Sequence, residues 1–260
     1  MLLPTTQPAD LPTTKPAGAH AVDPAGVARP ITALRAARAH LRFWSVAVAG
    51  VGLDLWSKHW AFATLRQGRS RVLIPNVLEF HTTLNPGALF GLGASRTGLF
   101  VVASLLALAL VLWMFAQCPA RRWFTHIALG AVFAGALGNM YDRVFVKLVQ
   151  FPPNSGHYWM LPSEAGPDVT LEDYPPDADA ALRHVPRTLA GELQPVGCVR
   201  DFIKVSQKWF GGGDLWPWVF NVADMLLVGG VGALAILMLR DRRPAAGPAK
   251  PELDAARPEP

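Results

Sequence analysis

The chain has 260 residues, 51% of them hydrophobic, a net charge of +5 at pH 7 and a sequence pI near 9.6. Its mean hydropathy of +0.25 hides an uneven distribution, because 19 of the 23 prolines lie in residues 1–30, 152–195 and 244–260. The remaining segments are much more apolar, and uncharged stretches such as 98–116 are long enough to cross a bilayer. This pattern argues against a soluble globular protein. The basic residues flank apolar segments without forming a stripe interleaved with aromatics, so we expect no nucleic-acid partner.

The N-terminal segment is predicted to be a disordered cytoplasmic tail that covers residues 1–41. Pro, Ala and Thr dominate its first part, a composition that cannot bury a core. It lacks the basic start and the apolar run of a secretion signal, so no cleavage is expected there.

Apolar segments long enough to cross a membrane follow this tail. They are 43–65, 98–116, 123–145 and 218–239. Small residues such as Gly130 and Gly138 in the third segment permit close helix packing. The expected fold is therefore an all-α membrane protein, a four-transmembrane-helix bundle.

Basic residues near the ends of these segments predict the orientation in the membrane. Eight of them lie close to one face, and they are Arg35, Arg38, Arg42, Arg121, Arg122, Arg240, Arg242 and Arg243. The positive-inside rule then places both termini in the cytoplasm. The only two cysteines, Cys118 and Cys198, fall on opposite sides and are not expected to pair.

The loops on the outer side differ in character. Residues 72–84, within the outer loop 66–97, alternate and are rich in β-branched side chains, which predicts short strands at the membrane surface. Residues 150–197 are rich in proline and acidic residues, and we interpret them as a large outer insertion between the third and fourth spans.

Ionisable residues within membrane spans are costly, so each of them is a functional candidate. Asp142 and Arg143 fall at the outer end of the third span, Asp224 at the outer start of the fourth, and Asp201 shortly before it. Two carboxylates held close together cannot both ionise readily, which leaves one acid and one base near neutral pH. Such a pair can activate water against a peptide carbonyl without a metal or a nucleophilic side chain.

Each of these motifs also has a purely structural interpretation. Asn221 and Asp224 have the spacing of a helix cap, and Asn85-Pro86-Gly87 is a common turn. Asp54 and Lys58 lie four positions apart, which favours a simple ion pair within one helix.

Asp142 has two structural or functional alternatives. It could pair with its neighbour Arg143, or it could be the partner of Asp224, since it lies inside the span.

Five sequence blocks taken together are more specific than any of them alone. In chain order they are Asp54-Leu-Trp-Ser-Lys58, Asn85-Pro-Gly-Ala-Leu-Phe-Gly91, Gly135-Ala-Leu-Gly-Asn139-Met-Tyr-Asp142-Arg143, Val199-Arg-Asp201-Phe202 and Trp216-Pro-Trp-Val-Phe-Asn221-Val-Ala-Asp224. With these blocks the chain resembles the lipoprotein signal peptidases, also called signal peptidase II, over about 43–149 and 198–239.

The resemblance implies an aspartic endopeptidase of the bacterial inner membrane whose active site faces the periplasm. Its substrates would be prolipoproteins, cleaved before a cysteine that carries diacylglycerol. The resemblance also implies Asp201 and Asp224 as the catalytic pair, in place of Asp142 and Asp224.

The same resemblance implies roles for the other polar residues of the blocks. Residues that line and orient the site would be Asn85, Asn139, Arg143 and Asn221. Residues that hold the architecture would be Asp54, Lys58 and Asp142, the last of them in a structural ion pair.

The chain departs from the family in one place, because Arg143 and Asp201 are 58 positions apart, far more than is usual. We expect the insertion between them to be a surface excursion that lets Asp201 return beside Asp224. No cofactor and no metal is expected, since His157 and His184 lack ligand-like spacing. The expected partners are prolipoproteins and membrane lipids, and the expected state is a monomer.

The expected division of the chain follows from these assignments. It comprises the tail 1–41, three spans with their outer loop in 42–149, the periplasmic insertion 150–197, the catalytic segment with the fourth span in 198–239, and a cytoplasmic tail 240–260. Two alternatives stay open: a transporter-like membrane protein that uses Asp54, Asp142 and Asp224, and a family member that has become an inactive scaffold.

Overall fold

A computed structural model of the chain describes its helices, its strands and most of their connections. The described residues are 32–87, 97–152, 155–160, 168–176, 180–186, 188, 193–208, 212 and 215–241. Most of the predicted N-terminal tail (1–31), most of the C-terminal tail (242–260) and residues 88–96, which include the end of the second sequence block (88–91), lie outside these residues.

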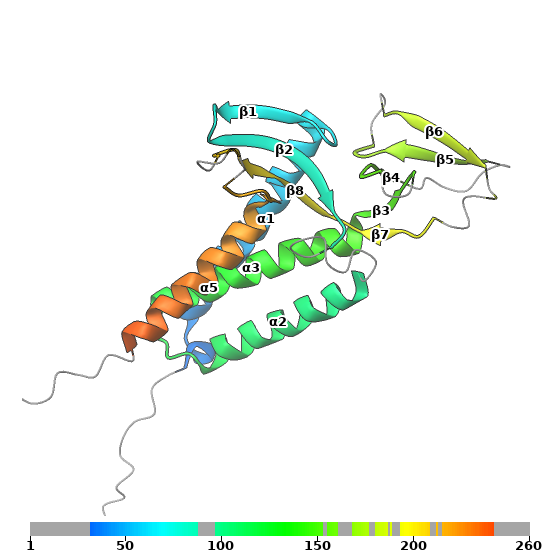
Figure 1. Cartoon of the computed structure of the whole chain (residues 1–260). Coiled ribbons are helices and arrows are strands. Elements are labelled where there is room, and N and C mark those ends of the chain that lie inside the picture. Colours follow the sequence, from blue (N-terminus) through cyan, green and yellow to red (C-terminus); the bar gives the residue numbers. More distant parts are fainter. Residues whose placement is uncertain are drawn as a thin grey trace, which may run out of the picture. The chain divides into compact units, whose positions relative to one another are not determined.

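The helices are η1 (Ala33–Arg35), α1 (Ala37–Leu65), α2 (Thr97–Gln117), α3 (Trp123–Phe145) and α5 (Val222–Asp241). The long helices lie alongside one another, and α3 contacts α1, α2 and α5 (Figure 1). Close packing on α3 depends on small residues. A Cβ added at Gly130 would lie 2.6 Å from the Phe43 carbonyl oxygen of α1, and one added at Gly135 would collide with the Ala223 carbonyl oxygen of α5.

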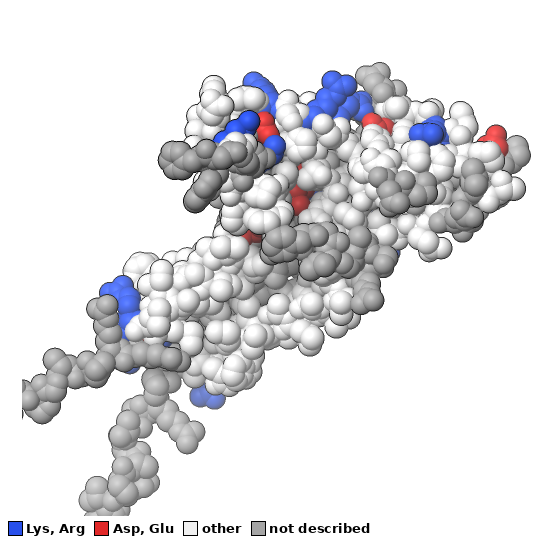
Figure 2. Space-filling model, in the orientation of Figure 1, with Lys and Arg blue, Asp and Glu red and all other residues white. Residues whose placement is uncertain are grey.

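Two helices, α2 and α5, are long and apolar enough to cross a membrane. Their most apolar windows have mean hydropathies of 2.7 and 2.3, yet only 17% and 11% of those windows are buried within the protein. A core helix of a soluble protein would bury its apolar residues, so the exposed surfaces of α2 and α5 fit contact with lipid. Figure 2 shows the corresponding uncharged band, with Lys and Arg side chains towards the two ends of the helices.

The first sheet consists of β1 (Ser70–Ile74), β2 (Leu78–Asn85), β8 (Val199–Val205) and β9 (Val219–Phe220). Its order is β1-β2-β8-β9, and all neighbours are antiparallel. The first two strands confirm the strands predicted over 72–84. The central strand β8, in contrast, comes from more than a hundred positions further along the chain.

The second sheet is formed by β3 (Lys147–Gln150), β4 (Tyr158–Met160), β5 (Asp168–Asp173), β6 (Leu182–Pro186) and β7 (Val196–Gly197). Its order is β6-β5-β4-β3-β7, so the first strand pairs with the last in sequence. The chain thus leaves α3 through β3 and returns through β7 at the neighbouring position, directly before β8. This closure brings Asp201 back to the helices despite the long insertion.

The prediction of an all-α four-transmembrane-helix bundle is wrong. The described residues contain nine strands in two sheets, and only α2 and α5 qualify as membrane-spanning by length and composition. α1 and α3 do not qualify, and they carry the ionisable residues Asp54, Lys58 and Asp142, which are fully buried inside the protein. The sequence does not predict the second sheet because its strands are short and two of them pair across 50 positions.

Two helix ends and one connection lie close together at the end of the helices away from the sheets (Figure 1). The Ala33 amide donates to the Cys118 carbonyl oxygen at 2.7 Å, and Arg122 forms an ion pair with Asp241. The start of α1, the connection between α2 and α3, and the end of α5 are therefore neighbours. Cys118 and Cys198 are both buried free thiols.

Candidate functional site

Strand β8 carries Asp201 into the interior. Neighbouring residues of a strand point to opposite faces, so Arg200 and Asp201 are directed to different sides of β8. The Asp201 side faces β2 and the start of α5, where its carboxylate accepts hydrogen bonds from Asn85 Nδ2 (3.2 Å to Oδ2) and from Asn221 Nδ2 (2.6 Å to Oδ1). Asp201 is only 3% exposed.

The start of α5 positions Asp224. The Asp224 amide donates to Asn221 Oδ1 at 3.0 Å, and the Asn221 amide donates to Asp224 Oδ2 at 3.1 Å. This reciprocal pair is a capping box, so the capping interpretation of the motif is confirmed. Because the cap uses Oδ2, the second oxygen Oδ1 remains for other contacts, and it accepts a hydrogen bond from Asn139 Nδ2 at 2.7 Å.

Two amide side chains connect the two aspartates. Asn221 Nδ2 donates to Asp201 and also to Asn139 Oδ1 at 3.1 Å, and Asn139 in turn donates to Asp224. Asn221, which binds Asp201, is thus hydrogen-bonded to Asn139, which binds Asp224. One network of hydrogen bonds therefore connects both carboxylates. Asn85 completes the arrangement from β2, and its Oδ1 accepts from the Gly87 amide at 3.0 Å, which confirms the predicted turn.

Burial and the neighbouring charge of Asp224 favour the protonated form of Asp201. Burial and, secondarily, the nearby charge of Asp224 raise the pKa of Asp201 to about 7, although the hydrogen bonds from Asn221 and Asn85 and the charge of Lys58 oppose the rise. An acid with this pKa is still protonated in about half of the molecules at pH 7, whereas an ordinary aspartic acid is ionised there. The geometry therefore provides one proton donor and one acceptor within a single hydrogen-bonded group.

Arg143 extends the site on the side of α3. Its guanidinium donates to the Asn139 carbonyl oxygen at 3.3 Å and to the Gly87 carbonyl oxygen at 3.2 Å, and it lies 5.1 Å from the ring centroid of Phe100. These contacts tie the loop after β2 to α3 close to the aspartates.

A groove of about 940 Å³ contains all of these polar groups except the fully buried Asn221. Asn85, Asn139, Arg143, Asp201 and Asp224 line it together with apolar and aromatic residues from the β8–α5 connection and from the first turns of α5. The apolar part comprises Leu215, Trp216, Pro217, Trp218, Val219, Phe220, Met225, Leu227 and Val228. A few convergent polar groups in a large apolar groove are typical of a substrate site.

A cluster of buried charges surrounds Asp142, next to the group that holds the two aspartates. Lys58 forms ion pairs with Asp54 at 2.8 Å and with Asp142 at 3.3 Å, and Arg200 forms one with Asp142 at 2.6 Å. The ion pair expected between Asp54 and Lys58 is therefore present. Asp142 forms its ion pairs with Lys58 and Arg200. The two alternatives predicted from the sequence, a pair with Arg143 or with Asp224, are therefore wrong.

Arg200 is the site residue that the sequence reasoning missed. Its position next to Asp201 in a strand with buried faces is the only signal in the sequence, because its partner Asp142 lies 58 positions away. The sequence predicts only a structural role for Lys58. Its Nζ also donates to Asn139 Oδ1 at 3.1 Å, and Asn139 in turn binds Asp224.

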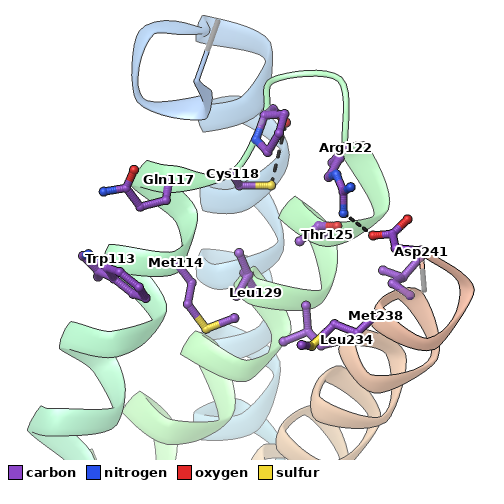
Figure 3. A pocket seen from close by; sticks show the side chains of 12 residues that line it. Trp113, Met114, Gln117, Cys118, Arg122, Thr125, Leu129, Leu234, Met238 and Asp241 are labelled. Atoms are coloured by element: carbon purple, nitrogen blue, oxygen red, sulfur yellow. Dashed lines mark hydrogen bonds and ion pairs between the residues drawn. The ribbon is translucent and has the colours of Figure 1, made fainter. Parts of the chain in front are cut away.

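A second cavity, of about 270 Å³, lies at the far end of α2, α3 and α5 (Figure 3). Its walls include Trp113, Met114 and Leu129, and Asp241, which pairs with Arg122, is the one carboxylate among the described residues that line it. The described part of this cavity holds no carboxylate pair, so the groove beside the sheets is the candidate active site.

The histidines of the insertion pair with neighbouring side chains. His157 Nε2 lies 3.0 Å from Asp173 Oδ1, and His184 Nδ1 lies 3.1 Å from Thr170 Oγ1. Within the part of the chain that the structure describes, there is no cluster of three potential metal-binding side chains.

Comparison with known proteins agrees with this geometry. The family model for signal peptidase (SPase) II matches residues 46–240. The chain belongs to the signal peptidase II family. A lipoprotein signal peptidase of Rhodopirellula baltica is 33% identical over 207 residues, which cover 78% of this chain and 72% of that protein. One of Desulfitobacterium hafniense is 28% identical over 176 residues, which cover 68% of this chain and 78% of the relative.

The fold is also similar to that of solved structures. A bacterial membrane enzyme determined by the in meso method superimposes with a TM-score of 0.51 over 77% of this chain and 90% of that chain. The two sequences are 24% identical, so the likeness concerns the fold. This member of the signal peptidase II family is thus a bacterial membrane peptidase, and in this chain the two apolar helices α2 and α5 are accompanied by two sheets.

Proposed function

We propose that this signal peptidase II is an aspartic endopeptidase that removes the signal peptides of lipoprotein precursors. The observation that carries the proposal is the pair Asp201 and Asp224, bridged by Asn221 and Asn139 at the edge of one large groove. The names of the relatives support the substrate class, and the arrangement of the carboxylates supports the mechanism.

Asp201 and Asp224 share one proton in the resting enzyme, and Asp201 holds it because burial and the charge of Asp224 raise its pKa to about 7. The second carboxylate takes a proton from water, which attacks the carbonyl carbon of the scissile peptide bond. The proton on Asp201 then passes to the leaving amide nitrogen. Asn221, Asn139 and Asn85 hold the two carboxylates in place, so that little reorganisation is needed during the reaction.

The groove fits a substrate that is part peptide and part lipid. Asn85 and Arg143 offer hydrogen-bond donors to the peptide, while Trp216, Phe220 and Val228 provide apolar walls for lipid chains. Cleavage before a cysteine that carries diacylglycerol would place the peptide bond between the polar and the apolar part of this groove.

The test is cleavage of a purified diacylglyceryl-modified prolipoprotein by the full chain in detergent. Asp201→Asn and Asp224→Asn are each expected to lose at least about a thousandfold in kcat, because the shared proton or the base is removed. Asp168→Asn, at an exposed position of β5, is the matched control and is expected to cleave as the parent does. Undiminished cleavage by either active-site variant would rule out the proposed mechanism.

The transporter-like alternative is not favoured. A proton relay across a membrane needs ionisable groups through the depth of the bilayer. Here α2 carries no charged residue, and α5 carries none between Asp224 and Arg240.

We further propose that the sheets and the groove face the periplasm and that both termini lie in the cytoplasm. The positive-inside rule supports this orientation, because Arg121 and Arg122 lie in the short connection between α2 and α3 at the opposite end of the helices. A monomer surrounded by membrane lipids, without nucleic acid, is the state in which we expect the enzyme to act.

A further inference from the structure

Arg200 forms hydrogen bonds to Asp142 of α3 with both its side chain and its backbone. Its guanidinium donates to Asp142 Oδ1 through Nε at 3.1 Å and through a terminal nitrogen at 2.6 Å. Its backbone amide donates to Asp142 Oδ2 at 3.0 Å. Asp142 is fully buried and Arg200 is 8% exposed, so water does not compete for these bonds.

These three bonds determine where the following residue lies. Arg200 and Asp201 are consecutive in β8 and point to opposite faces. Holding the Arg200 backbone against α3 therefore sets the depth and register of Asp201 relative to Asn221 and Asp224. Two guanidinium N–H groups that donate to one carboxylate oxygen, together with the backbone amide on the other oxygen, restrain orientation more strongly than a single hydrogen bond does.

The insertion contributes a second contact to Arg200. Tyr174, the residue directly after β5, lies within interaction range of the Arg200 side chain, so that its hydroxyl group and the guanidinium influence each other electrostatically. Tyr174 packs against Phe62 of α1 with ring centroids 5.7 Å apart, and its amide donates to Asp173 Oδ1 at 2.9 Å. Asp173 in turn accepts a hydrogen bond from Gln67 Nε2, after the end of α1, at 3.2 Å.

We propose that Arg200 and Tyr174 are positioning residues through which the insertion 150–197 holds the catalytic aspartate Asp201 in place. This inference rests on the proposed function. The insertion then helps to fix the position of β8, and through β8 the position of Asp201 in the active site.

Opposite charges within the cluster compensate one another, which offsets the cost of burying them. Asp54 and Asp142 are balanced by Lys58 and Arg200, so four buried charges sum to zero. The cluster is connected to both aspartates. Arg200 directly precedes Asp201 in the chain, and Lys58 donates a hydrogen bond to Asn139, which donates one to Asp224.

The experiment compares Tyr174→Phe, Arg200→Lys and the double variant with the parent, using the cleavage assay described above. Tyr174→Phe removes only the hydroxyl, and we expect kcat to fall roughly three- to tenfold with KM unchanged. Arg200→Lys keeps the charge but cannot make both guanidinium hydrogen bonds to Asp142 Oδ1, and we expect kcat to fall about tenfold or more. Tyr174→Phe in the Arg200→Lys background should cost nothing further, because its effect passes through Arg200.

A matched control and a pH profile separate positioning from a loss of folded protein. Tyr158 is buried in the same apolar cluster that Tyr174 packs against, and Tyr158→Phe is expected to retain the parent's kcat. A displaced Asp201 would be less buried and farther from Asp224, so the alkaline limb of the pH–kcat profile should move to lower pH. The other charged groups that face Asp201 are Arg143 and Lys58, and none of these variants changes them.

The outcomes are distinct. A smaller folded fraction lowers the height of the pH profile without moving its limbs, and thermal unfolding followed by tryptophan fluorescence measures it independently. If Tyr174→Phe keeps both the kcat and the alkaline limb of the parent, the inference is overturned while the proposed function stands. If the parent itself does not cleave the precursor, both fail. Should Arg200→Lys not fold, the comparison of Tyr174→Phe with Tyr158→Phe still decides.

Discussion

At the scale of single residues, the same groups perform structural and chemical tasks together. Asn221 caps α5 with its Oδ1 and bonds Asp201 with its Nδ2. Asp224 closes the cap with one oxygen and accepts from Asn139 with the other. The helix cap therefore orients the carboxylate, and the capping and catalytic interpretations of this motif are compatible.

The raised pKa of Asp201 predicts a pH dependence of stability. A carboxyl group whose pKa in the folded state lies above its unfolded value near 3.8 contributes stability that is fully present below that value. The contribution is lost as pH rises through about 7, the pKa of folded Asp201. We therefore expect the Tm of the parent, relative to that of Asp201→Asn, to fall between pH 3.8 and 7. Thermal unfolding of both proteins across this range checks it, and a constant difference would contradict the assigned pKa.

At the scale of elements, α3 is the helix on which the site is assembled. It supplies Asn139 and Arg143 to the groove and Asp142 to the charge cluster, and it contacts all three other long helices. Its glycines let α1 and α5 approach closely enough for Asp54 Oδ1 to accept a hydrogen bond from the Ala223 amide at 2.9 Å. A Cβ added at Gly138 would lie 2.5 Å from Asp54 Oδ2.

Substitution of Gly135 tests this close approach. Its Cβ would collide with the Ala223 carbonyl oxygen and lie 2.9 Å from the Leu227 amide nitrogen, so Gly135→Ala should push the start of α5 away from α3. We expect a loss of about 1–3 kcal/mol in stability and a lower kcat, because Asp224 moves with α5.

Gly229→Ala on α5 is the control. No atom lies within 4 Å of the added Cβ, so stability should stay the same or rise slightly, since alanine favours the helix. Thermal unfolding and the cleavage assay compare the two variants, and equal effects would contradict the packing argument.

At the scale of the whole molecule, the arrangement separates an apolar part from a polar part. The exposed apolar surfaces of α2 and α5 lie along the helices, whereas both sheets adjoin one end of them (Figure 1). The groove lies where the two parts meet, because its lining comes from β2, β8 and the start of α5. A substrate with a lipid anchor and a peptide can therefore reach the aspartates from the level of the membrane surface.

The proposed orientation predicts the reactivity of introduced cysteines in intact cells. With Cys118 and Cys198 replaced by alanine, Asp168→Cys in β5 should react with a membrane-impermeable maleimide. Arg121→Cys, in the connection between α2 and α3, should react only after the membrane is permeabilised. The reverse pattern would show that the sheets face the cytoplasm.

The sequence alone determined the local features of the chain. Apolar runs predict helices, and α2 and α3 match the expected segments 98–116 and 123–145 to within a residue at each end. The alternation over 72–84 predicts the first two strands, and the spacing of Asn221 and Asp224 predicts their cap. These features depend on neighbours within a few positions, so a local pattern is sufficient.

Only the tertiary structure decided how distant segments combine. Asp142 binds Arg200 across 58 positions, Asn139 binds Asn221 across 82, and β3 pairs with β7 at the two ends of the insertion. No local pattern distinguishes these partners, since the choice depends on which buried charges and strand edges the packed helices bring together. For the same reason the uneven composition predicted apolar helices such as α2 and α5, but neither the second sheet nor its position beside β8.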